Sequence, residues 1–181
     1  MMKFVLIAAA SILSTLASGF ALPDLTPRAT VIRPELAIVV KEDTPDTPVP
    51  LTNIAEASRT NGARTVETFF CFVLPACTGS CTISFSDAIS ATGRRTIQLF
   101  STSTCPVDRG SWNTRPFLDV HKGTFLVPPT ATGPATVVED FGLTFPCPVT
   151  TTNYGFAVIP VGDEDYLTWD ITKGGLIITC N

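Results

Sequence analysis

Short apolar runs alternate with turn-forming residues along most of this chain, most clearly over residues 153–180. Between the runs of this stretch lie two glycine-containing turns, one of them acidic. In its middle run apolar and polar side chains alternate, which places Leu167, Trp169 and Ile171 on one face of a strand. We therefore expect this stretch to close a β-sheet, with Trp169 in the core.

The same pattern predicts strands through the rest of the domain. Alternating or β-branched and aromatic runs bounded by turn residues indicate strands at residues 65–74, 82–85, 95–102, 119–127, 135–138, 141–145, 154–161, 166–171 and 176–180. In residues 65–74 both faces are apolar, so both should be covered, and Gly123 is a natural position for a β-bulge. The fold class predicted is all-β, a single disulfide-stapled β-sandwich or jelly roll at residues 56–181.

The first 55 residues have a different character. Residues 1–21 combine a basic start, a short apolar run and small residues before position 22, which predicts a cleaved signal peptide. Residues 22–55 are rich in proline and threonine and are expected to form an extended arm. Within this arm residues 35–41 are apolar enough to add a strand to a sheet edge, although a loose tether would fit equally well.

Six cysteines in a secreted chain predict disulfide bonds and no free thiol. Their positions allow 15 pairings, among which spacing alone does not choose. The pairing that we expect joins Cys77 to Cys81 as a local clip, Cys71 to Cys180, and Cys105 to Cys147.

Charge narrows the class of partner. The formal net charge is −4, with no basic cluster beyond Arg94-Arg95. This balance argues against nucleic acid and against an anionic membrane as partners. The expected partner is instead a host extracellular protein or a cell-wall glycan, and no cofactor is expected.

Candidate catalytic groups are few. His121 is the only histidine, and a solvent-facing histidine on a strand is the expected role for it. One histidine and oxidised cysteines do not supply a zinc site. The run Asp163-Glu164-Asp165 could bind calcium or act as a glycosidase pair, but adjacent carboxylates in one turn do not face each other across a cleft, which favours a solvated acidic turn. We therefore expect that the protein is not an enzyme.

Aromatic side chains are the better indication of binding. Trp112 lies in a polar loop beside Asn113 and Arg115, where its ring could stack on a sugar or anchor a protein interface. The ring could equally fold back as a plug over one end of the sandwich, with Arg115 stacked on it. Tyr166, on the polar face of its strand, is the fourth expected binding residue.

Two stretches resemble known families. The segment Ser111-Trp112-Asn113-Thr114-Arg115-Pro116, followed by Gly123-Thr124-Phe125, is similar to the Trp-Asn-x-x-Pro segment of carbohydrate-binding modules of the DNRLRE type, which are β-sandwiches. Residues 56–180 resemble small secreted proteins of ascomycete fungi, in particular the ubiquitin-3-binding-protein C-terminal-domain family. The features that carry this second resemblance are Ser58-Arg59-Thr60-Asn61-Gly62, Leu74-Pro75, Phe145-Pro146-Cys147-Pro148, and residues 166–171 before Gly174-Gly175.

These resemblances imply a secreted fungal β-sandwich acting at a host or cell-wall surface. The expected function is that of a non-enzymatic interaction protein, an extracellular effector or elicitor that contributes to virulence. A glycan-binding cell-wall module that uses Trp112 is the alternative, and a secreted glycoside hydrolase is the third hypothesis.

Overall fold

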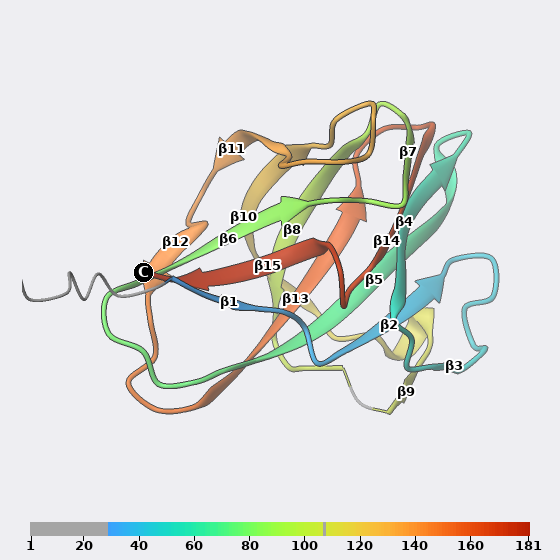
Figure 1. Ribbon diagram of the computed structural model, residues 1–181. Coiled ribbons are helices and arrows are strands. Elements are labelled where there is room, and N and C mark those ends of the chain that lie inside the picture. The colour runs from blue at the N-terminus through green and yellow to red at the C-terminus, as the bar shows by residue number, and fades with distance from the viewer. Residues whose placement is uncertain (1–28, 107) are drawn as a thin grey trace, which may run out of the picture.

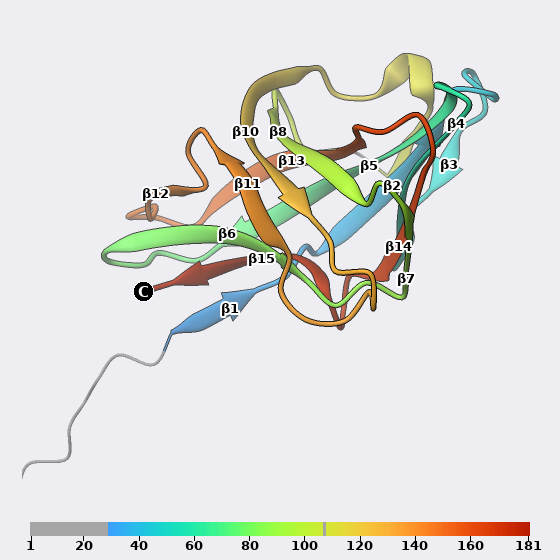
Figure 2. The ribbon, with the colours of Figure 1, turned by 90° about the horizontal axis from the view of Figure 1, so that it is seen from above.

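A computed structural model of the protein describes residues 29–106 and 108–181. Two β-sheets face one another and enclose the main hydrophobic core (Figures 1 and 2). The smaller sheet has four antiparallel strands in the order β1-β15-β6-β12. Their bounds are Thr30–Ile32 for β1, Gly175–Cys180 for β15, Ser80–Ser86 for β6 and Thr144–Pro146 for β12.

The larger sheet is curled and has nine strands (Figure 2). Eight of them follow the order β11-β10-β8-β13-β5-β4-β14-β7, and β2 pairs with β5 beside β4. Their bounds are β2 Leu36–Lys41, β4 Ile54–Thr60, β5 Ala63–Leu74, β7 Ser90–Gly93, β8 Thr96–Thr102, β10 Leu118–Leu126, β11 Thr136–Asp140, β13 Thr152–Pro160 and β14 Asp165–Asp170. A separate ribbon joins β3, Val49–Pro50, to β9, Arg109–Gly110.

The main core follows from the alternation in the sequence. On β6, buried and partly exposed residues alternate, so that Cys81, Ile83 and Phe85 point inward. Phe85 meets Trp169 of β14 edge to face, with ring centroids 5.2 Å apart, and this contact joins the two sheets. The all-β sandwich and the core position of Trp169 are therefore confirmed.

The larger sheet is covered on both faces, as the apolar pattern of β5 predicts. Phe70 and Phe72 lie in the main core. Phe69 lies on the opposite face, in a second apolar cluster with Ile38, Val40 and Ala157. A short 3₁₀ helix, Trp112–Thr114, lies against this second cluster through Trp112.

Most of the described part of the arm, residues 29–55, is extended and pairs with other strands, apart from a turn at residues 42–46. β2 pairs with β5 from Leu36↔Cys71 to Lys41↔Val66, and β1 pairs with β15. The apolar run at residues 35–41 therefore adds a strand, and it does not form a loose tether. Residues 1–21, the expected signal peptide, lie outside the described residues, as do residues 22–28 of the arm.

Two disulfides tie the strands together. Cys71 on β5 is bonded to Cys105, which follows β8, and only β13 lies between these two strands in the sheet. Cys81 on β6 is bonded to Cys147, which directly follows the neighbouring strand β12. The strand order brings together cysteines that are 34 residues apart in the first bond and 66 residues apart in the second.

The expected cysteine pairing is wrong. Neither Cys77–Cys81 nor Cys71–Cys180 nor Cys105–Cys147 is bonded, because the order of the strands, which sequence does not reveal, sets the neighbours of each sulfur. The structure also leaves Cys77 and Cys180 as free thiols, where we expected none.

Candidate functional site

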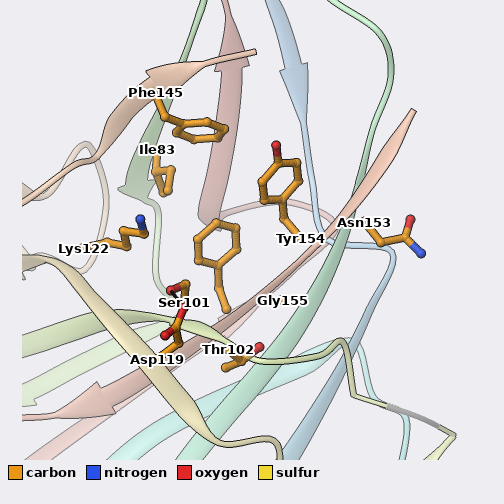
Figure 3. A pocket seen from close by; sticks show the side chains of 10 residues that line it. Ile83, Ser101, Thr102, Asp119, Lys122, Phe145, Asn153, Tyr154 and Gly155 are labelled. Atoms are coloured by element: carbon orange, nitrogen blue, oxygen red, sulfur yellow. Dashed lines mark hydrogen bonds between the residues drawn. The ribbon is translucent and has the colours of Figure 1, made fainter. Parts of the chain in front are cut away.

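An open pocket of about 410 Å³ lies where the two sheets diverge, and we call it the mouth pocket (Figure 3). The smaller sheet contributes one side chain from β6 and one from β12. The larger sheet contributes the remainder, from β8, β10 and β13. The lining residues are Ile83, Ser101, Thr102, Asp119, Lys122, Phe145, Asn153, Tyr154, Gly155 and Phe156.

One wall of the mouth pocket is aromatic. The half-buried rings of Phe145 and Tyr154 lie with centroids 5.6 Å apart, although they come from different sheets. The ring of Tyr154 is stacked with that of Phe156, with centroids 6.4 Å apart. Phe156 in turn meets Phe72 of the core edge to face. The wall is therefore anchored in the core, while its outer rings remain partly open to solvent.

The opposite end of the pocket is polar and lies at an irregular part of β10. The pairing of β10 with β8 shifts register between Leu118 and His121 and again between His121 and Gly123, which confirms the bulge expected near Gly123. Bulges reorient side chains and are frequent next to binding sites. Ser101 donates a hydrogen bond to Oδ2 of Asp119 at 3.3 Å and accepts one from the backbone of Val120, so the carboxylate is held in place.

Lys122 adds a positive charge to this polar end (Figure 3). The ion pairs of the described residues are Arg64–Asp43, Arg115–Glu67 and Lys173–Asp170, and Lys122 takes part in none of them. Asn153 lies at the outer edge, with its amide directed away from the rings.

Gly155 shapes the floor of the pocket. A Cβ atom at this position would lie 2.2 Å from Oγ1 of Thr102 and 2.5 Å from the carbonyl oxygen of Thr104. Only glycine therefore allows β13 to lie this close to the end of β8. The hydroxyl of Thr102 is fixed by donation to the Thr104 carbonyl at 2.7 Å.

Trp112, the first residue expected to bind, is half-buried and packs against the second apolar cluster. The guanidinium of Arg115 lies over its ring, 3.8 Å from the centroid. Arg115 also forms an ion pair of 3.3 Å with the buried carboxylate of Glu67. The ring folds back onto the outer face of the larger sheet with Arg115 stacked on it, and not over one end of the sandwich. Its use for sugar stacking stays a prediction.

Asn113 and Tyr166 do not line the mouth pocket. Asn113 is exposed, and its amide donates to Oδ1 of Asp46 at 2.8 Å, which ties the 3₁₀ helix to the β2–β3 loop. Tyr166 lies on β14 between β4 and β7, with 46% of its surface exposed. Trp112, Asn113 and Arg115 do share a hollow of about 360 Å³, which Tyr166 does not line.

His121 is half-buried, so the histidine that was expected to face solvent does so only in part. Its ring lies between Phe100 and Phe141, at centroid distances of 4.8 and 5.0 Å. Nε2 lies 3.1 Å from the carbonyl oxygen of Gly123 and 3.3 Å from Oγ1 of Thr124. These contacts hold the bulged part of β10, which carries the polar end of the mouth pocket.

The acidic run at residues 163–165 holds a turn together. Asp165 is buried and accepts a hydrogen bond from the backbone of Gly162 at 2.8 Å. Glu164 accepts from the backbone of Asn61 at 2.7 Å. Since both carboxylates are engaged by backbone N–H groups of turns, their geometry is that of a structural element.

Comparison with known proteins adds no assignment: no family model matches the chain, and no curated protein matches it. The family resemblances described above therefore stay predictions.

The mouth pocket was missed by sequence reasoning because its residues converge from five strands. A partial indication was present, since Phe145 stands in a proline-bounded run and Tyr154 opens the run at 154–161. Nothing in the sequence, however, shows that β12 of one sheet ends beside β13 of the other.

Proposed function

We propose that this protein is a secreted, non-enzymatic binding protein that holds a carbohydrate of a cell wall in the mouth pocket. The observation that carries the proposal is the pairing, in one open hollow, of the Phe145 and Tyr154 rings with the side chains of Asp119 and Lys122. This combination suits a ligand with both apolar faces and hydroxyl groups.

The chemistry of a sugar ring matches the two ends of the pocket. Its C–H faces are apolar and suit contact with partly exposed aromatic rings, while its hydroxyl groups both donate and accept hydrogen bonds. Asp119 can only accept when ionised, and Lys122 can only donate, so together they serve both roles. The volume of about 410 Å³ falls within the range of small-molecule sites.

The lining of the pocket favours binding over hydrolysis. A glycoside hydrolase typically uses two carboxyl groups about 5–9.5 Å apart. Among the residues that line the mouth pocket, Asp119 alone carries a carboxyl group. A second carboxylate facing the ligand is thus lacking within this site.

Secretion is supported from two directions. The leader-like residues 1–21 predict export, and the structure contains two disulfides, which form and persist in oxidising compartments. Within residues 29–106 and 108–181 there is no helix of the length and apolarity needed to cross a membrane.

The test is retention of the purified protein on insoluble chitin, β-glucan and xylan. We expect Tyr154→Ala to lower the affinity for the retained polysaccharide about fivefold, since an aromatic contact contributes on the order of 1 kcal/mol. Tyr154→Phe keeps the ring and should bind nearly as wild type. Tyr166→Ala is the matched control, because it removes an exposed tyrosine outside the pocket.

Equal retention of Tyr154→Ala and wild type, with both folded by circular dichroism, would exclude the mouth pocket as the glycan site. Trp112→Ala belongs in the same panel, since a selective loss there would move the site to the hollow beside the 3₁₀ helix.

A second candidate is an effector that binds a host extracellular protein. It is favoured by the exposed apolar side chains at the start of β10, where Phe117 is 83% exposed and Leu118 and Val120 follow it. An elicited response in host tissue that disappears with Phe117→Ser but persists with Tyr154→Ala would support this candidate over the glycan site.

A further inference from the structure

Four cysteine sulfurs meet where the end of the chain reaches the β5–β6 loop. Sγ of Cys180 lies 3.5 Å from Sγ of Cys81 and 3.7 Å from Sγ of Cys147, which are bonded to each other. The sulfurs of Cys77, Cys147 and Cys180 all lie within 4.8 Å of one another. The two free thiols of the described residues are thus neighbours within one cluster.

The backbone around the cluster is held in place. The backbone of Asn181 donates to the carbonyl of Ser80 at 3.0 Å, and that of Cys77 donates to Pro148 at 3.0 Å. Gly79, at φ +98°, packs so closely on the chain end that a Cβ there would lie 2.5 Å from the carbonyl oxygen of Asn181. The loop that carries Cys77 therefore stays beside the strand that carries Cys180.

The two thiols differ in access. Cys180 is buried, whereas Cys77 is half-buried on a loop and borders an open hollow of about 710 Å³ with Ala76, Thr78 and Val149. A dissolved oxidant can therefore reach Cys77 first. Cys77 lies in no strand, so its side chain can turn toward Cys180 without breaking a strand pair.

We propose that Cys77 and Cys180 are an oxidation site and form a third disulfide, which fastens the C-terminal strand β15 to the β5–β6 loop. This inference is independent of the ligand of the mouth pocket. The oxidant is a small disulfide such as oxidised glutathione, or the active-site disulfide of an oxidoreductase.

The step balances as two successive exchanges. The Cys77 thiolate attacks one sulfur of the oxidant, forms a mixed disulfide and releases the first thiolate of the oxidant. The Cys180 thiolate then attacks Sγ of Cys77, forms the Cys77–Cys180 bond and releases the second. Two electrons pass to the oxidant, and the two thiol protons pass to solvent or to the released thiolates.

Burial affects the second exchange. Desolvation, with a smaller contribution from Cys77, raises the pKa of the Cys180 thiol to about 11. Since only the thiolate attacks, closure of the bond should be slower than attack by an exposed thiol at neutral pH.

Tryptic mapping of the full-length protein tests the pairing. The purified protein is incubated with oxidised glutathione, alkylated at acid pH and digested without reduction. Residues 65–94, which lie between Arg64 and Arg95, carry Cys71, Cys77 and Cys81, whereas residues 174–181 carry Cys180 alone. We expect the peptide 174–181 to remain linked to the peptide 65–94 in wild type.

Cys77→Ser distinguishes Cys77 from Cys81 as the partner. In this variant we expect the peptide 174–181 to separate, with Cys180 alkylated. In Cys180→Ser, Cys77 should retain a glutathione adduct, because the thiol that would displace the glutathione is absent. Recovery of unlinked, alkylated 174–181 from oxidised wild type would overturn the proposal, and so would a link that survives in Cys77→Ser.

Discussion

Glu67 is a carboxylate buried on the outer face of the central strand β5. Among the described residues its one ion-pair partner is Arg115, which also stacks on Trp112. The stacking of Arg115 on Trp112 could be predicted from their spacing in the sequence. The carboxylate beneath them could not, because alternation along β5 gives the face of Glu67 but not what covers that face.

Burial raises the pKa of Glu67, although Arg115 and Arg59 oppose the shift. A carboxyl group with a raised folded-state pKa stabilises the fold below its ordinary pKa of about 4.5, and this contribution is lost as pH rises through the raised value. We therefore expect Glu67→Gln to become more stable relative to wild type as pH rises from about 4 to 7. Thermal unfolding at several pH values measures this difference.

Glu42→Gln is the matched control. Glu42 is exposed, and its pKa is lowered, chiefly by the hydrogen bond that it accepts from the backbone of Thr65. The contribution of Glu42 to the stability of the fold is present above its ordinary pKa and is lost as pH falls. Glu42→Gln should therefore become less stable relative to wild type as pH rises. Parallel pH dependence of the two variants would contradict the assignment for Glu67.

At the level of elements, the positions of the strands in the sequence could be predicted far better than which strands pair with each other. Alternating runs, or runs of β-branched and aromatic residues bounded by turn residues, placed β5, β8, β13, β14 and β15 within a few residues. Strand order depends on contacts between segments up to 150 residues apart, such as β1 with β15, and these leave no local pattern. The cysteine pairing and the mouth pocket both follow from that order.

The turn between β14 and β15 carries the chain from one sheet to the other, and Gly175 makes it possible. Gly175 has φ +79°, and a Cβ there would lie 1.9 Å from Cδ1 of Trp169. Gly175→Ala should cost about 1–2 kcal/mol for the left-handed backbone and about 1–3 kcal/mol more for the clash. Guanidinium denaturation measures the loss.

Gly133→Ala separates the two costs. Gly133 has a similar φ of +88°, but a Cβ there would meet nothing within 4 Å. This variant should therefore lose only the backbone part. Equal losses at Gly133 and Gly175 would show that Trp169 can move aside, and that the packing of β14 against β15 is looser than the distances indicate.

At the scale of the whole molecule, long-range pairing dominates. The strand β5 pairs with β13, whose residues lie about 80 positions later, and the two ends of the described chain meet where Thr30 pairs with Cys180. Each such contact closes a long loop, and loop closure costs conformational entropy before the contact contributes. The disulfides reduce that cost by restricting the unfolded chain.

The Cys71–Cys105 bond allows this effect to be measured without disturbing the four-sulfur cluster. It spans 34 residues, for which the chain-entropy relation gives a stabilisation of about 4 kcal/mol. We expect Cys71→Ala/Cys105→Ala to lower the free energy of unfolding by roughly 2–5 kcal/mol, measured by guanidinium denaturation. The variant should still fold, because the two-sheet core does not depend on this bond. An unchanged midpoint would mean that the unfolded chain is already restricted near these residues, whereas loss of all strand signal in circular dichroism would mean that the sheet cannot hold β5 and β8 in place without the bond.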